Sequence, residues 1–295
     1  MANLITLGSL IDHTVEHYRS HFKELIGISL WLVVAAMPFL FAGYLAPFGV
    51  DEFTPTNEVA AYLIVSCIGL ITVTLARLWT SVCLIFTINA RAKDGTPDHV
   101  ALGKKSWKFI LPFFVLSTGI ALALSLAAGL FLLPGLLIMM LNTLPGTAGT
   151  ALGIAGVILM FAGVVAAAYT LVKYSVELAF AQYYLLLDAE SSKFSFKTLW
   201  KTVLASRKFV KGQWWAVAIR LVIPSLIIGL ITYGVTAITN LAATVLISFA
   251  AASLSPLAIT LISVALTLSV FIVVAIVMPL YSLSTYYLYD SVSKR

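Results

Sequence analysis

Residues 257–288 read LAITLISVALTLSVFIVVAIVMPLYSLSTYYL and contain no charged side chain. A transmembrane helix needs about 20 consecutive apolar residues, because each residue adds about 1.5 Å toward crossing a hydrocarbon core about 30 Å thick. The run is longer than that minimum and therefore predicts a helix that crosses a lipid bilayer.

Other apolar segments of similar length precede this run, so the sequence predicts six transmembrane helices. They cover residues 25–48, 59–90, 109–141, 151–187, 214–236 and 257–288. The stretch 237–255 is uncharged as well. It forms a seventh span, a re-entrant segment or a continuation of its neighbours.

The composition fits a chain that is solvated by lipid. Hydrophobic residues make up 61% and charged residues 10% of the chain, and the mean hydropathy is +1.04. Soluble domains carry about 25% charged residues, because they need a polar surface around their core. We therefore predict an all-α, polytopic helical bundle with one transmembrane domain over residues 1–295. We expect no nucleic-acid partner.

The loops between the predicted spans differ in charge and so indicate the orientation of the chain. The turns at 49–58 and 142–150 contain no Lys or Arg. Short cytoplasmic loops are rich in these residues. The turns at 49–58 and 142–150 are therefore predicted to lie outside, and the basic loops and ends of the chain in the cytoplasm. We therefore predict a multi-pass protein of the inner (cell) membrane with both termini in the cytoplasm. The same orientation argues against a seventh span, which would place the C-terminus outside. The basic residues behind this prediction are Arg19, Lys23, Arg91, Lys93, Lys104, Lys105, Lys108, Lys193, Lys197, Lys201, Arg207, Lys208, Lys211, Lys294 and Arg295.

A pattern with a period of about 95 residues suggests an internal repeat. Its units would be residues 1–95, 96–190 and 191–295, each with an amphipathic or basic stretch followed by two spans. Hydropathy alone can produce the same pattern, so both interpretations stay open.

Two amphipathic segments lie outside the predicted spans. Residues 7–25 place apolar side chains on one stripe of a helix, and residues 196–208 repeat them at i, i+3, i+4, i+7 and i+8. Such helices lie on the inner leaflet, attracted by anionic lipid, or pack on the bundle as connecting helices, and the two interpretations are compatible. The second segment combines the apolar residues Phe196, Leu199, Trp200, Val203 and Leu204 with the membrane-surface residues Lys197, Lys201, Arg207 and Lys208.

Four charged residues fall inside the predicted spans, namely Arg77, Lys173, Glu177 and Arg220. A charge is unfavourable within lipid unless it is paired or hydrated, so these residues are candidates for a ligand or lipid-headgroup site. Lys173 and Glu177 are four positions apart and can neutralise each other on one helix. We predict that the four share one polar layer that takes an anionic headgroup or solute. Alternatively, the long basic side chains extend separately to water.

Stripes of small residues occur in the third and fourth predicted spans. Small side chains let membrane helices approach closely, so these stripes predict helix packing. In the fourth span Gly149, Gly156 and Gly163 recur every seven residues, and in the third span Ala121, Ser125 and Gly129 recur every four.

The sequence lacks the short motifs of common enzyme classes. It has no HExxH, GxSxG or paired-cysteine motif. His13, His17 and His21 follow each other at four-residue spacing, but a hydrated stripe is favoured over a metal site because no further ligand is indicated. We therefore predict a protein without enzymatic activity, metal or cofactor.

Residues 205–217, ASRKFVKGQWWAV, resemble a bacterial membrane-domain family named for glycerophosphodiester phosphodiesterases. LLLD at 185–188, YLYD at 287–290 and the opening Leu7-Gly8 followed by YRSHF at 18–22 are similar to that family's pattern as well. The resemblance covers nearly the whole chain and is specific around 206–215. Named members carry a separate catalytic barrel, which has no counterpart in these 295 residues. The resemblance therefore implies the membrane part alone, without the phosphodiesterase activity.

Together these patterns favour a non-enzymatic membrane protein that binds lipid, mainly anionic lipid, or a protein partner at its cytoplasmic face. The alternatives are a small-solute transporter, which the repeat and the charges within the spans would suit, and a lipid-modifying membrane enzyme.

Overall fold

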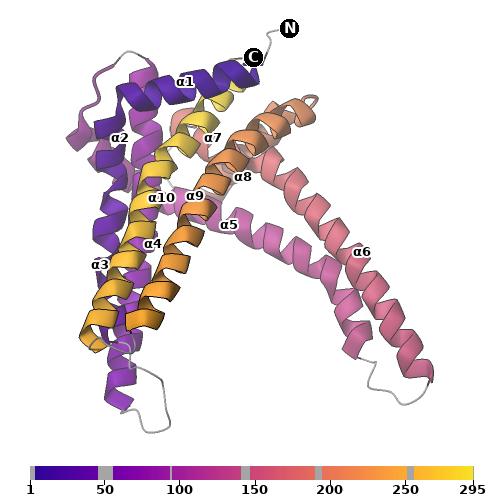
Figure 1. Ribbon diagram of the computed structural model, residues 1–295. Helices are drawn as coiled ribbons and strands as arrows, with labels where there is room; N and C mark the ends of the chain where they lie inside the picture. Colours follow the sequence, from indigo (N-terminus) through magenta and orange to yellow (C-terminus); the bar gives the residue numbers. More distant parts are fainter. Residues whose placement is uncertain are drawn as a thin grey trace. The chain divides into compact units, whose positions relative to one another are not determined.

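The computed structural model describes residues 4–45, 56–93, 95–140, 147–189, 195–250 and 256–294. Every regular element in these ranges is a helix, which confirms the all-α prediction (Figure 1). The helices are α1 (Leu7–Ser20), α2 (Phe22–Ser29), α3 (Trp31–Leu45), α4 (Thr56–Ala92), α5 (His99–Met140), α6 (Thr147–Leu178), α7 (Ala181–Leu187), α8 (Phe196–Val210), α9 (Trp214–Ala250) and α10 (Pro256–Ser293).

Several of these helices are long and apolar enough to cross a membrane. Five qualify by themselves within the described ranges, and a sixth span results if the bent pair Leu7–Ser20 and Phe22–Pro38 is taken as one. The two parts of that pair meet at 83°, so the amphipathic α1 does not continue the direction of α2 and α3. The described helices thus agree with the predicted α-helical membrane bundle of about six spans, the sixth span being the bent pair.

The ambiguous stretch after residue 236 continues the preceding helix. Helix α9 runs without a break from Trp214 to Ala250, while residues 251–255 lie outside the described ranges. Most of the predicted turns at 49–58 and 142–150 lie outside them too.

The chain divides into two compact units, Met1–Ile110 with Ile219–Arg295, and Leu111–Ala218. In the first unit α3, α4 and α10 run side by side (Figure 1). Their core consists of aliphatic side chains that are completely or almost completely buried, because each apolar stripe is covered by its neighbours. This core includes Val82, Leu84, Ile88, Leu283 and Leu288.

In the second unit α5 and α6 approach each other at glycines. A Cβ atom added to Gly135 would lie 2.6 Å from the backbone nitrogen of Met160, and one added to Gly163 would meet the carbonyl oxygen of Phe131. Gly156 faces Met139 in the same way. The glycine stripe of α6 is therefore a packing surface at Gly156 and Gly163, as expected, while the surroundings of Gly149 lie outside what the structure describes. The face of α5 that meets it lies nearer the end of that helix than predicted, because a Cβ atom at Gly129 would have no neighbour within 4 Å.

The other end of the second unit contains a small core between α5, α7 and α8. Leu116, Ala181, Leu185 and Leu199 are buried together there, and the amide of Gln182 donates to the hydroxyl of Ser117 at 3.0 Å. These contacts hold α8 against the unit and so position the groove described next.

Candidate functional site

The amphipathic stripe expected on α8 divides into two rows. Leu199 is buried and Val203 packs beside it in the small core of the second unit. Phe196, Trp200 and Leu204, at i, i+4 and i+8, remain 77%, 57% and 46% exposed. One row thus packs on the protein, as a connecting helix would, and the other forms an apolar ridge among the basic residues of α8.

A tight turn between α8 and α9 brings two tryptophans toward α6. Gly212 has a φ of 86°, a backbone conformation that glycine adopts without a steric cost. The indole nitrogen of Trp214 donates to the carbonyl oxygen of Lys173 at 3.3 Å. The Trp214 and Trp215 rings pack edge to face with centroids 4.7 Å apart.

An ion pair joins α6 to α8. Nε of Arg207 lies 2.9 Å from Oε2 of Glu177, with the side chains 48% and 14% exposed. Next to it, the Ser206 hydroxyl donates to the Glu177 carbonyl oxygen at 2.7 Å. Both contacts place the basic face of α8 beside the last turns of α6.

Cations from both helices gather around one aromatic ring. The ammonium of Lys173 lies 5.8 Å from the centroid of the Tyr174 ring, and the guanidinium carbon of Arg207 lies 5.7 Å from it. The same ammonium lies 6.0 Å from the Tyr169 ring. At such distances the electron-rich face of an aromatic ring attracts a cation, so the two tyrosines help to hold Lys173 in place.

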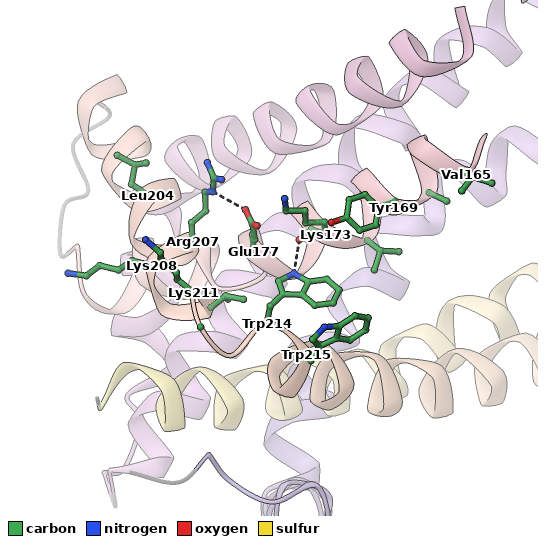
Figure 2. Close-up of a pocket in the computed structure, with 14 residues that line it drawn as sticks. Val165, Tyr169, Lys173, Glu177, Leu204, Arg207, Lys208, Lys211, Trp214 and Trp215 are labelled. Atoms are coloured by element: carbon green, nitrogen blue, oxygen red, sulfur yellow. Dashed lines mark hydrogen bonds and ion pairs between the residues drawn. The ribbon is translucent and has the colours of Figure 1, made fainter. Parts of the chain in front are cut away.

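These residues line a groove of about 1280 Å³ within the second unit (Figure 2). At one end the lining has the basic side chains of Arg207, Lys208 and Lys211 from α8 and the turn after it, and Glu177 is its single acidic residue within the described ranges. At the other end the wall is apolar and aromatic, with Val165 and Tyr169 of α6 lying away from the basic residues of α8. We call this the α6–α8–α9 groove, and its lining is Val165, Ala168, Tyr169, Val172, Lys173, Glu177, Leu204, Arg207, Lys208, Val210, Lys211, Gly212, Trp214 and Trp215.

The structure places the four charges of the predicted spans in different surroundings. Lys173 and Glu177 line the α6–α8–α9 groove, and Glu177 forms its ion pair with Arg207 on the neighbouring helix. Arg77 is an exposed residue of α4, and Nε of Arg220 donates to the carbonyl oxygen of Ile5 at 2.6 Å. Because Arg77 and Arg220 belong to the first unit and the other two to the second, the shared polar layer stays a prediction.

The four basic residues predicted for the membrane surface all lie on α8. Arg207 and Lys208 line the α6–α8–α9 groove, whereas Lys197 and Lys201 are exposed on the helix and do not line it. Lys211 is one of the basic residues that indicate the orientation, and Trp214 and Trp215 belong to the stretch 205–217. No pattern in the sequence links these three residues to a site. What joins them is the turn at Gly212, which residue patterns alone do not show.

His17 of α1 and His21, which follows the helix, both have hydrogen-bond partners in the first unit. Nδ1 of His17 lies 2.7 Å from the hydroxyl of Tyr287 on α10, and Nδ1 of His21 lies 3.2 Å from the carbonyl oxygen of His17. In the part of the chain that the structure describes, no three His, Cys, Asp or Glu side chains are grouped as metal ligands. The two cysteines are not bonded to each other, as their spacing on one helix requires.

The long apolar helices make this chain a multi-pass α-helical membrane protein. No family model, no curated protein and no solved structure matches it. The resemblance to the membrane domain named for glycerophosphodiester phosphodiesterases therefore stays a prediction.

Proposed function

We propose that this chain is a non-enzymatic protein of the bacterial inner membrane that binds anionic lipid at its cytoplasmic face. The observation that carries the proposal is the α6–α8–α9 groove, whose lining changes from basic at one end to apolar at the other. A phospholipid has the same polarity along its length, with a charged headgroup followed by hydrocarbon chains. The apolar wall includes Val172 and Trp215, which are 51% and 75% exposed and offer contact area to an acyl chain.

The outer row of α8 supports the same proposal. An interfacial helix buries apolar side chains at the headgroup boundary and surrounds them with Lys and Arg. Phe196, Trp200 and Leu204 form such a row, and Lys197 and Lys201 lie beside it in the sequence. Each basic residue near an anionic surface contributes about 1 kcal/mol of attraction.

The direction of the groove follows from the loop charges. The basic end includes residues of the loop that the positive-inside rule assigns to the cytoplasm. The headgroup would then lie at the inner leaflet, and the acyl chains would follow the apolar wall toward the bilayer centre.

The test is binding of fluorescent anionic lipid to the purified full chain in nanodiscs of neutral lipid. Replacing Lys208 and Lys211 by Gln is expected to weaken binding about tenfold, in line with the loss of two charged contacts. The matched control replaces Lys104 and Lys108 by Gln, which removes the same charge from exposed positions outside the groove.

A parallel assay separates the proposal from transport. Liposomes that contain the protein are tested for uptake of small ions and solutes under a gradient. Equal weakening by both double variants, or solute flux without any preference for anionic lipid, would overturn the proposal in favour of surface attraction or transport.

A further inference from the structure

Building on the proposed function, we infer that the α6–α8–α9 groove selects lipids whose headgroup is a phosphomonoester, which carries two negative charges on one phosphorus, over singly charged phosphodiester lipids. The inference names the ligand class of that groove and rests on the charge and geometry of its basic end.

The first argument is charge balance. Among the described residues, the lining has four cations, Lys173, Arg207, Lys208 and Lys211, against one carboxylate. Glu177 is engaged with Arg207. Among the residues that the structure describes, no acidic side chain pairs with any of the three lysines of the lining. A doubly charged headgroup offsets this excess better than a singly charged one.

The second argument is convergence. Lys173 on α6 and Arg207 on α8 both lie near the Tyr174 ring, at 5.8 and 5.7 Å from its centroid. The side chains of Lys173, Glu177 and Arg207 all line the groove, and Figure 2 shows the contact that joins Glu177 to Arg207. Positive charge from two helices is thus gathered at one place, which suits a compact dianion.

The third argument is the geometry of the guanidinium. Arg207 uses Nε to bind Glu177, and among the residues that the structure describes no acceptor is paired with its two terminal nitrogens, which can therefore bind a second acceptor. Guanidinium binds phosphate through paired, parallel hydrogen bonds. A phosphomonoester presents three terminal oxygens and can engage this pair of donors and a lysine together, whereas a phosphodiester has only two.

The fourth argument concerns the chains attached to the phosphate. Trp214 is anchored on the Lys173 carbonyl oxygen, and its neighbour Trp215 is 75% exposed beside the apolar wall. The anchored pair bounds the groove where the headgroup gives way to hydrocarbon. This favours a lipid over inorganic phosphate, which shares the headgroup chemistry but has no chain to bury.

The experiment compares two lipids on the full chain in nanodiscs of neutral lipid. A phosphomonoester lipid is added at half the mole fraction of a phosphodiester lipid, so that the total lipid charge is equal. We expect the phosphomonoester to bind about tenfold more tightly at about pH 7.5. Its advantage should shrink as the pH falls through about 6, where a phosphomonoester loses its second charge.

Two double variants test whether the preference for the phosphomonoester lipid arises in the groove, and a competitor tests whether the ligand is a lipid. Lys208 and Lys211 are exposed, so their joint replacement by Gln leaves the packing intact and should abolish the preference. The same change at Lys104 and Lys108, which are exposed and lie outside the groove, should preserve it. Inorganic phosphate should compete only weakly, and equally strong competition would overturn the assignment to a lipid.

The outcomes separate this inference from the proposed function. Equal binding of both lipids at matched charge would overturn the phosphomonoester inference and leave anionic-lipid binding in place. No preference for either lipid over neutral lipid would overturn both. A preference that survives in the Lys208 and Lys211 variant would remove the groove as its source.

Discussion

Arg207 and Glu177, thirty positions apart on α8 and α6, are joined by a 2.9 Å ion pair in which the arginine is about half exposed and the carboxylate mostly buried. The two partners are therefore not equivalent. Removing Arg207 leaves the carboxylate of Glu177 charged in a poorly hydrated place. Removing Glu177 leaves the guanidinium of Arg207, which still reaches water.

The first prediction is an unequal response to removing either partner. Arg207→Gln should lower the free energy of unfolding by about 1 to 3 kcal/mol, because a mostly buried carboxylate loses its donor. Glu177→Gln should lower it by less than about 1 kcal/mol, as for an exposed ion pair. Thermal unfolding of both variants and of the double variant in one detergent measures the coupling. Equal losses in the two single variants would contradict the burial difference.

Glu177 also competes with any anion for Arg207. Glu177→Gln should therefore raise the affinity of the groove for anionic lipid several-fold, since it removes the one acidic group that the described residues contribute to the lining. Lipid titration in nanodiscs measures this, with Asp188→Asn, an acidic residue outside the lining, as the control. An unchanged or reduced affinity in the Glu177 variant would show that the anion does not bind at this end of the groove.

The third prediction concerns the packing of α5 on α6. In Gly163→Ala the new Cβ atom meets the carbonyl oxygen of Phe131 on the facing helix, so the helices must move apart. Overpacking of this kind costs about 1 to 3 kcal/mol. In Gly129→Ala the Cβ atom meets nothing within 4 Å, and the thermal midpoint should stay unchanged or rise slightly. Equal midpoints for the two variants would contradict the close approach at Gly163.

The fourth prediction is a loss of stability in acid that originates at His17. Burial, followed by the nearby charges of His21 and Arg91, lowers the pKa of His17 from 6.5 to about 4. The folded state thus favours the neutral ring, and below pH 6.5 the unfolded chain binds a proton that the folded chain does not. The stabilising effect is complete above pH 6.5 and is lost progressively as the pH falls toward about 4.

Unfolding temperatures measured across this interval test the His17 prediction. His17→Gln should flatten the acid side of the curve and lower the midpoint at neutral pH, because the ring contact with Tyr287 is lost. His13→Gln, at an exposed position of the same helix, is the control. An acid slope that is the same in both variants would assign the effect to another group.

The fifth prediction is topological. Cysteines introduced at Thr147 and Thr96, in a variant without Cys67 and Cys83, should react differently with an impermeant thiol reagent in intact cells. Thr147, the first residue of the apolar α6, should be labelled from outside, whereas Thr96, in the basic segment before α5, should not. Label at Thr96 in sealed cells would reverse the orientation and move the basic end of the groove to the outer leaflet.

The sequence predicts the helices of this chain well, because a membrane requires long apolar runs whose backbone bonds are satisfied within one segment. The runs around Val82 and Leu283 could be assigned from hydropathy alone. The 83° bend between α1 and α2 and the continuation of α9 past residue 236 could not, because hydropathy does not encode helix direction.

The site was predictable in its residue types but not in its grouping. Lys173, Glu177 and Arg207 were all candidates, yet the local pairing of Lys173 with Glu177 that their spacing allows is replaced by the contact between Glu177 and Arg207. That contact depends on how α8 folds back on α6, which the small core around Leu185 and Leu199 determines. Tertiary packing of this kind leaves no periodic signal in the sequence.

Helix α9 has 37 residues and α10 has 38, which corresponds to roughly 55 Å each at about 1.5 Å per residue. A hydrocarbon core is only about 30 Å thick. Each of these two helices must therefore tilt strongly from the membrane normal or extend into the water on one side. A tilted helix can reduce its tilt when the bilayer thickens and increase it when the bilayer thins, so that lipid continues to cover its apolar surface. Helices of this length give the protein a way to keep its fold in membranes of different thickness.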